Sequence, residues 1–380
     1  MRTSPSSATS PGIPAATTSA DAPRLTVDLE ALAANYRTLA AESGGAETAP
    51  VVKADGYGLG AAQVARRLWD EGARSFFVAR LAEGEALRND LGPARSATIY
   101  VLDGLTPGSG PRLAATGLAP VLSSLPQTSE ANAFARSLAR PLPCALQIDT
   151  GMNRQGLSPA EARALAEGID RLRGLDLVLV MSHLGAASDP QDPHNKLQLE
   201  RFSEVRALFP GARASLAASA GVFLGPDYRF DMVRPGVSLY GGGPFEKPFP
   251  RILAVASLTA PILDIRHVAA GERLGYGSQL VLVAPTRVAI VAAGYADGVI
   301  RAARGGGYVW AAGARRRLLA VNMDLLVFEL GEAEARVGEP VELLGPNVAL
   351  DDLAEAAGTV AHEVLVRLGR RGECVYLGAT

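Results

Sequence analysis

The sequence predicts an α/β protein with an N-terminal (β/α)8 barrel of the TIM type and a C-terminal all-β domain. Apolar, strand-like runs alternate with amphipathic helical patterns over about 220 residues, as parallel strands with covering helices require. From about residue 250 onward, short β-rich runs are separated by Gly and Pro instead. A chain of 380 residues is long enough to bury two hydrophobic cores. We place a disordered tail at 1–23, the barrel at 24–240 and the β domain at 241–380.

The first pattern is a strand at 25–28, followed by a helix in which Leu29, Leu32, Tyr36 and Leu39 recur at helical spacing. We expect this strand to join the C-terminal domain. The strand and helix patterns of the barrel then follow in pairs: 48–54 and 60–72, 75–79 and 81–91, 97–103 and a loop, 118–124 and 129–140, 144–149 and 158–169, and 177–184 and 195–209.

The C-terminal part contains β-rich runs with hardly a helical pattern between them. They lie at 251–268, 287–298, 308–313, 316–330 and 340–345. Short runs bounded by Gly and Pro turns predict a sandwich or a barrel. One helix at 350–358 and a final strand complete this domain, and no internal repeat of fixed period is found.

Composition and charge narrow the class of protein. The chain is 48% hydrophobic and 20% charged, with a net charge of -2, so we expect neither a nucleic-acid partner nor a membrane partner. Pro and Ser interrupt every apolar stretch of residues 1–23, which argues against a secretory signal. Two cysteines, Cys144 and Cys374, form no metal-binding pattern. We therefore expect a cytoplasmic protein without a metal.

Chemically useful side chains follow several of the predicted barrel strands. Lys53 ends the run "PVVK", Arg154 follows the strand at 144–149, His183 ends "LVLVMSH", and Arg234 follows "DMV". Because the carboxyl ends of barrel strands meet at one face, we expect these four side chains to share a pocket. Read singly, Lys53 fits a solvated strand end, His183 a core histidine and Arg234 a buried ion-pair partner.

The glycines after Lys53 allow a second interpretation. "GYGLG" after a strand resembles the glycine turn of a dinucleotide-binding site, but it does not match GxGxxG. The acidic residue expected about 20 positions further on falls near Arg74 and Ser75. The sequence therefore disfavours that kind of site.

Eight segments together resemble the alanine racemases in order and approximate spacing, over residues 24–378. They are "VVKADGYGLG", "QIDTGMNRQG", "SHLGAASDP", "SLAASAG", "VRPGVSLYG", "LGYGSQL", "AAGYADG" and "VNMDLLVFEL". The resemblance implies pyridoxal 5'-phosphate (PLP) as cofactor and an N-terminal barrel with a C-terminal β domain. The implied function is the interconversion of L- and D-alanine by two bases, with D-alanine supplied for peptidoglycan.

The resemblance also implies the roles of the catalytic residues. Lys53 would hold PLP as a Schiff base and serve as one base, and Tyr276 would be the opposed base. His183 would donate a hydrogen bond to the tyrosine, with Arg234 behind it. Arg234 would also face the pyridine nitrogen, which a guanidinium cannot readily protonate, so the ring would be a weaker electron sink.

The binding contacts come from the same resemblance. The phosphate would be held by Tyr57, Ser219 and the backbone amides of Gly236 and Val237. The substrate carboxylate would meet Arg154 and the Met323 amide, and Asp324 would orient groups nearby. In the family the tyrosine matching Tyr276 reaches the other subunit's site, which implies a homodimer.

Two positions depart from the family. Gln147 stands where many members have a lysine that orients the substrate arginine, and Arg370 lies near the place of a phosphate-contacting tyrosine. The first departure leaves substrate affinity open, and the second leaves that contact unassigned.

Three other functions remain as alternatives. A racemase of the same fold could act on serine or a broader range of substrates. A decarboxylase of this barrel class would need a carboxylate at the pyridine nitrogen and a cysteine in the β domain. A non-catalytic PLP-binding protein would have the barrel without the β domain.

Overall fold

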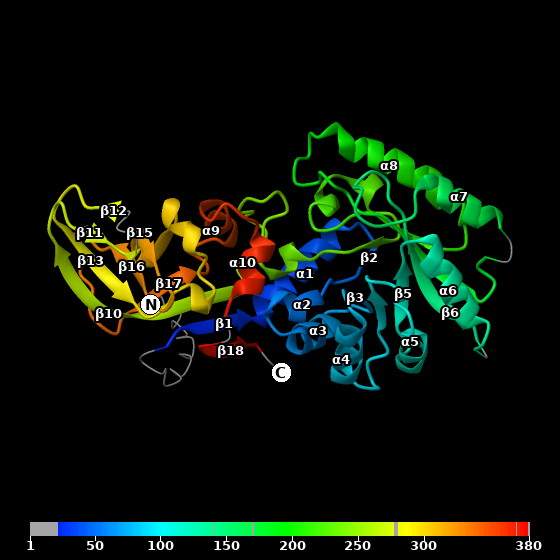
Figure 1. Cartoon of the computed structure of the whole chain (residues 1–380), viewed down its shortest axis with the longest axis horizontal. Coiled ribbons are helices and arrows are strands. Elements are labelled where there is room, and N and C mark those ends of the chain that lie inside the picture. Colours follow the sequence, from blue (N-terminus) through cyan, green and yellow to red (C-terminus); the bar gives the residue numbers. More distant parts are fainter. Residues whose placement is uncertain (1–21, 139, 169–170, 277–279, 370, 379–380) are drawn as a thin grey trace, which may run out of the picture.

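The computed structural model describes residues 22–138, 140–168, 171–276, 280–369 and 371–378. They form an elongated molecule with two lobes, a barrel built mainly from the N-terminal half and a β lobe built mainly from the C-terminal third (Figure 1). The tail predicted at 1–23 lies outside the described residues, except for its last two.

Eight parallel strand segments make the barrel. Six of them pair in the order β3-β4-β5-β6-β7-β8, and β2 pairs with β9. Isolated bridges from Val51 to Phe77 and from Ala218 to Arg234 close the ring on both sides. The predicted barrel is therefore confirmed. Its strands are β2 (Glu47–Thr48), β3 (Ser75–Val78), β4 (Thr98–Val101), β5 (Ala119–Leu122), β6 (Leu142–Gln147), β7 (Leu175–Met181), β8 (Arg213–Ser215) and β9 (Met232–Val233).

Helices on the outside of the barrel connect these strands. Several begin at side-chain caps followed by Pro, as at Ser124, Ser158 and Asp192. The helices are α2 (Lys53–Tyr57), α3 (Ala61–Asp70), α4 (Leu81–Leu91), α5 (Gly110–Thr116), α6 (Leu125–Ala135), α7 (Pro159–Glu167) and α8 (Pro193–Arg206). We expected a loop where α5 lies. Its one buried apolar side chain, Leu113, gives too little periodicity for a helix prediction.

After β8 the covering helix is replaced by short 3-10 turns. These are η1 (Gly221–Phe223), η2 (Pro226–Tyr228) and, after β9, η3 (Val237–Tyr240). The turn at η3 starts beside the cavity described below, since both Gly236 and Val237 line that cavity.

The β lobe contains one eight-stranded sheet in the order β13-β16-β15-β14-β17-β10-β1-β18, which a further β10–β13 pairing closes on itself. The first strand, β1 (Arg24–Asp28), pairs antiparallel with β10 and parallel with β18. The other strands of this sheet are β10 (Ala256–Val268), β13 (Thr286–Val291), β14 (Tyr308–Ala311), β15 (Ala314–Val321), β16 (Leu326–Glu329), β17 (Pro340–Leu344) and β18 (Glu373–Leu377). Strands β11 (Arg273–Leu274) and β12 (Leu280–Val281) pair with each other in a separate two-stranded sheet.

Two helices near the C-terminus lie between the lobes: α9 (Leu350–Ala356) and α10 (Ala361–Arg367) (Figure 1). The sequence predicted only the first. Gly358 turns the chain with φ of 64°, and α10 follows directly, buried through Ala361, Val364 and Leu365. Two short 3-10 turns, η5 (Tyr295–Asp297) and η6 (Arg301–Gly305), lie between β13 and β14 in the β lobe.

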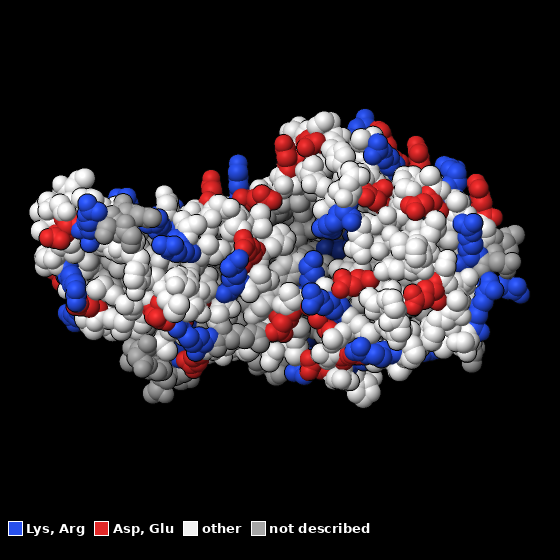
Figure 2. Space-filling model, viewed as in Figure 1, with Lys and Arg blue, Asp and Glu red and all other residues white. Residues whose placement is uncertain are grey.

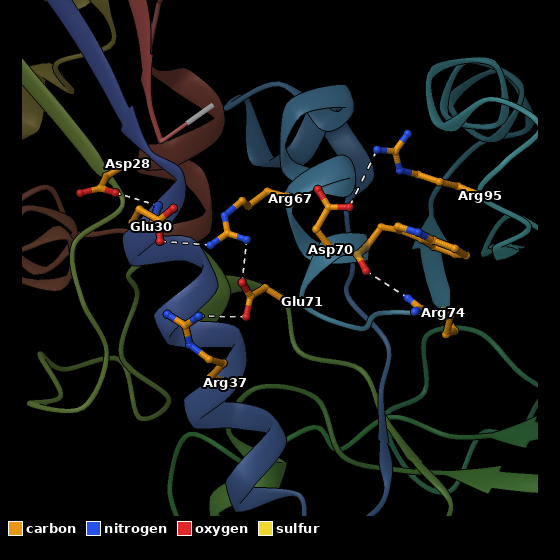
Figure 3. A network of polar contacts seen from close by, with 9 residues as sticks. Asp28, Glu30, Arg37, Arg67, Asp70, Glu71, Arg74 and Arg95 are labelled. Carbon is orange, nitrogen blue, oxygen red and sulfur yellow. Dashed lines mark hydrogen bonds and ion pairs between the residues drawn. The ribbon is translucent and has the colours of Figure 1, made fainter. Parts of the chain in front are cut away.

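Helix α1 (Leu29–Glu42) follows β1 out of the β lobe and packs on the barrel helix α3. Figure 3 shows the ion pairs between them. Arg67 pairs with Glu30 at 3.1 Å and with Glu71 at 2.6 Å, and Glu71 also pairs with Arg37 at 3.0 Å. Asp28 caps the helix by accepting the Glu30 amide. Such pairs near the surface add little stability singly, but together they fix where α1 lies on α3.

Acidic and basic side chains are mixed over the face shown in Figure 2, and the surface is hollowed between the lobes. Among the described residues, each helix is too short or too polar to cross a membrane.

Candidate active site

A cavity of about 500 Å³ opens at the carboxyl ends of the barrel strands. Its wall is completed from the β lobe side by residues near α9 and α10, including Asp351 and His362. The residues predicted for the site that line this cavity are Lys53, Tyr57, Arg154, His183, Ser219, Arg234, Gly236 and Val237. Side chains far apart in sequence are thus brought together, as the strand-end argument predicts.

Lys53 begins the turn α2 and does not end a strand, which corrects the sequence prediction. The strand pairing stops at the Val51–Phe77 bridge, two residues earlier. Residues 54–57 have φ between 52° and 63°, a left-handed turn in which three of the four residues are not glycine. Each such residue costs roughly 1–2 kcal/mol. Contacts to other elements must therefore hold this turn.

Two carboxylates make those contacts. Glu83 accepts a 2.9 Å hydrogen bond from the amide of Ala54, and Asp55 accepts a 2.8 Å hydrogen bond from the amide of Ala61. Burial lowers the pKa of Lys53, and the nearby charge of Arg154 lowers it further. Glu83 and Asp103 act in the opposite direction. The amine is therefore easier to deprotonate than an exposed lysine.

Arg234 is buried in the cavity wall with neutral oxygens as partners. Nη1 donates to Ser215 Oγ and Nη2 to the Ser182 carbonyl, each at 2.5 Å. In the described part of the chain no carboxylate forms an ion pair with it. Burial lowers its pKa to about 9, so the guanidinium is still charged at neutral pH.

His183 lies in the same wall as a neutral imidazole. Burial, followed by the charges of Arg234 and Arg154, lowers its pKa to about 3. Its backbone carbonyl accepts a 3.0 Å hydrogen bond from the buried Gln198 of α8. Gln198 also donates to Thr150 Oγ1 at 3.2 Å, which connects His183 to the loop that carries Arg154.

The opposite part of the cavity is suited to an anion. Ser219 Oγ accepts hydrogen bonds from the amides of Gly236 and Ser238, at 2.9 and 3.3 Å. The Tyr57 hydroxyl lies where a Cβ on residue 236 would be, so glycine is required there. The Tyr57 ring stacks on Tyr240 with centroids 4.6 Å apart, which fixes its position.

Three predicted residues are absent from the wall of this cavity. Tyr276 is 77% exposed and Met323 is 53% exposed, both in the β lobe. Asp324 pairs at 2.5 Å with Arg371, which also makes two bonds to the buried Asp297. The fold of one chain therefore does not bring these residues to Lys53.

The two departures from the family differ in what the structure describes. Gln147 lines the cavity with Arg154, and its amide donates to the Ile148 carbonyl at 3.3 Å. Arg370 lies outside the described residues.

Sequence reasoning missed three residues of the site. His362 lines the cavity with its ring centroid 5.9 Å from that of Tyr57, and burial, followed by the charge of Lys53, lowers its pKa. Glu83 and Gln198 act on the backbone of cavity residues from neighbouring helices. Glu83 and Gln198 lie inside ordinary helical patterns, and His362 lies in α10, which the sequence did not predict, so no local signal distinguishes these residues.

The arrangement joins a half-buried amine, a buried cation that pairs with no carboxylate among the described residues, and an anion-binding corner. An amine of lowered pKa is suited to covalent attachment of a carbonyl compound. Arg154 adds a second cation for a carboxylate. The cavity therefore fits a phosphorylated carbonyl cofactor and a small acid.

Comparison with known proteins gives matches over nearly the whole chain. A family model described as "Alanine racemase, N-terminal domain" matches residues 27–244, and one described as "Alanine racemase, C-terminal domain" matches residues 255–376. An alanine racemase of Methylobacterium nodulans is 46% identical over 95% of this chain and 97% of its own length. A catabolic alanine racemase of Mesorhizobium japonicum is 44% identical over 93% of each chain. A biosynthetic one of Agrobacterium fabrum is 43% identical over 94% of each chain.

Solved structures agree with these matches. The alanine racemase of Bartonella henselae, with covalently bound pyridoxal phosphate, superposes with a TM-score of 0.88 and 32% identity, covering 94% of this chain and 99% of that one. The biosynthetic alanine racemase of Pseudomonas aeruginosa gives a TM-score of 0.87 and 35% identity with the same coverage.

Proposed function

The chain belongs to the alanine racemase family, and we propose that it interconverts L- and D-alanine with PLP held covalently on Lys53. The observation that carries this proposal is the position of Lys53 in one cavity with Arg234 and with the anion-binding corner of Tyr57 and Ser219. The products would include D-alanine for peptidoglycan.

The residues present fit the cofactor. The Tyr57 and Ser219 hydroxyls and the amides at Gly236 and Val237 would hold its phosphate. A side chain at position 236 would collide with the Tyr57 hydroxyl. Glycine there therefore allows this hydroxyl and the backbone amides to lie close together at the phosphate position. Arg234 is assigned to the pyridine nitrogen, and its lack of a carboxylate partner in the described structure leaves its charge available.

When bound, PLP supplies an electron sink that makes the Cα proton of an attached amino acid acidic. The amine of Lys53 would take or return that proton on one face of the substrate Cα, and Tyr276 would take or return a proton on the opposite face. Arg154 would orient the substrate carboxylate. His183 is neutral at pH 7, because burial and the charge of Arg234 lower its pKa. Its imidazole N–H would donate a hydrogen bond to the Tyr276 oxygen.

Tyr276 and Met323 are exposed on the β lobe, so we propose a homodimer in which both reach the partner's cavity. Asp324 would hold the loop that carries Met323. An open cavity and an exposed tyrosine on the same chain support such an exchange of residues between subunits.

Racemisation of serine or of a broader set of amino acids is the second candidate. Gln147 is the observation that favours keeping it, because a neutral amide lies beside Arg154 where the family often has a lysine. The cytoplasm remains the proposed location, which the free cysteines Cys144 and Cys374 fit.

Three measurements test the proposal. Borohydride reduction of the purified protein should fix the cofactor on Lys53, as peptide mass spectrometry reads directly. Incubation of L-alanine in D2O should give deuterium at Cα together with the D form, and a panel of amino acids should rank alanine first. Absence of a cofactor label on Lys53 refutes the function, whereas a higher rate with serine refutes only the substrate.

A further inference from the structure

Glu83 of α4 connects two backbone segments that meet at the cavity. Its Oε1 accepts a 2.9 Å hydrogen bond from the amide of Ala54. Its Oε2 accepts hydrogen bonds from the amides of Ala79 and Arg80, at 2.8 and 3.1 Å. We propose that Glu83 is a positioning residue for Lys53, holding the backbone next to the lysine and supplying compensating negative charge. This inference rests on the proposed role of Lys53.

The position of Glu83 explains how the strained turn keeps its shape. The Ala54 amide is the first backbone group after Lys53, and it lies at the start of the left-handed residues 54–57. Val52, which precedes the turn, provides no side-chain cap. Glu83 also accepts hydrogen bonds from the amides of Ala79 and Arg80, which connect β3 to α4, so the backbone beside the lysine is tied to this strand-to-helix connection.

A carboxylate suits this place better than a neutral acceptor. Three amides donate to its two oxygens, which a glutamine side chain with one oxygen cannot match. Hydrogen bonds to an ionised acceptor are also stronger than those to a neutral one. The geometry therefore selects a charged side chain directly beside the lysine backbone.

Several charged or titratable groups act on the Lys53 amine. Arg154 lowers its pKa and Glu83 and Asp103 raise it, while His183 and His362 lie close enough to be affected by its charge. A lysine that both gives and takes a proton must not lose its basicity completely. Glu83 opposes the combined effect of burial and Arg154, so the amine can still accept a proton.

The test measures the Lys53 amine without using the cofactor. The full chain is prepared without PLP and labelled briefly with acetic anhydride over a range of pH, and labelling of Lys53 is read by peptide mass spectrometry. In Glu83→Gln the midpoint of labelling should move to lower pH by about 0.5–1 unit, because a charge that favours the ammonium form is lost.

The matched control is Glu85→Gln, the same change two residues along α4. Glu85 pairs with Arg112 at the surface and should leave the midpoint where it is in the original chain. A Glu83→Gln midpoint that is unchanged, or that moves no more than the control, overturns the proposal.

A second variant covers a Glu83→Gln chain that fails to fold. In Glu83→Asp the carboxylate is kept, but the shorter side chain cannot reach all three amides, so the midpoint of Lys53 labelling should move in the same direction by a smaller amount. A Glu83→Asp midpoint that equals that of the Glu85→Gln control contradicts the proposal. Failure of the borohydride label on Lys53 would instead refute the proposed function, and the labelling midpoints remain interpretable without it.

Discussion

Arg234 donates through Nη1 to the hydroxyl of Ser215 at 2.5 Å, and this bond joins the ends of two neighbouring barrel strands. Ser215 donates in turn to the Met232 carbonyl at 2.6 Å, so its hydroxyl accepts one hydrogen bond and donates another. The guanidinium is thus fixed by neutral groups, and its charge is not cancelled by a carboxylate within the described structure.

Ser215→Ala should destabilise the protein by about 1–3 kcal/mol, because a buried charged donor loses its partner. Urea unfolding measures this. Ser203→Ala is the control, since Ser203 lies on the exposed face of α8 and bonds only to the Leu199 carbonyl one turn earlier. Equal effects of the two changes would show that the Arg234 bond contributes nothing particular.

The low pKa of His183 predicts a dependence of stability on pH. Its folded pKa of about 3 lies below the ordinary value near 6.5, so the unfolded chain binds the proton more readily. This contribution is fully present above pH 6.5 and is lost as the pH falls toward 3, by up to about 1.4 kcal/mol per pH unit. Unfolding of the original chain and of His183→Gln at pH 7 and pH 5 measures it. The variant should show the smaller loss.

Gln198→Leu should disturb both His183 and the loop that carries Arg154. Gln198 is fully buried and bonds to Thr150, His183 and Gly185, so a leucine removes three buried hydrogen bonds, at a cost of about 1–3 kcal/mol. Unfolding and alanine kinetics are both measured, with a rise in KM expected because the Arg154 loop is loosened. Gln191→Leu, at an exposed position before α8, should change neither.

Arg371→Lys tests whether the loop that contains Met323 needs the ion pair between Asp324 and Arg371, which lies just before β18. Arg371 bonds twice to the buried Asp297 and once to Asp324, a forked geometry that lysine cannot reproduce. KM for alanine should rise roughly threefold to tenfold, with a smaller change in kcat. The control is Arg367→Lys, whose partner Glu363 is one turn away on the surface of α10. A change confined to kcat would contradict the substrate role proposed for this loop.

Mixing two inactive variants tests the shared site. Chains with Lys53→Ala and chains with Tyr276→Phe are co-expressed with different tags, and the hybrid is assayed. If each cavity takes its tyrosine from the partner, a hybrid dimer keeps one intact site, and a random mixture should regain about a quarter of the original activity. If each chain completes its own site, mixing restores nothing.

Parts of the site follow from local sequence, and parts do not. Lys53, His183 and Arg234 can be placed in one cavity because parallel strands end at the same face of a barrel. The left-handed turn after Lys53 could not be predicted, since Ala54 and Tyr57 ordinarily avoid positive φ. Helix α10 was missed because nothing in the sequence before it marks a second helix start.

The sequence alone determined the alternation of strands and helices, the change to a β lobe and the residue types at the strand ends, because these depend on short-range patterns. Only the tertiary structure decided that Glu83 and Gln198 bond to the cavity backbone, that His362 lines its wall, and that Tyr276 is exposed on the β lobe and does not line its own chain's cavity. Those relationships join residues distant in sequence through packing of separate elements, for which neither periodicity nor spacing carries information.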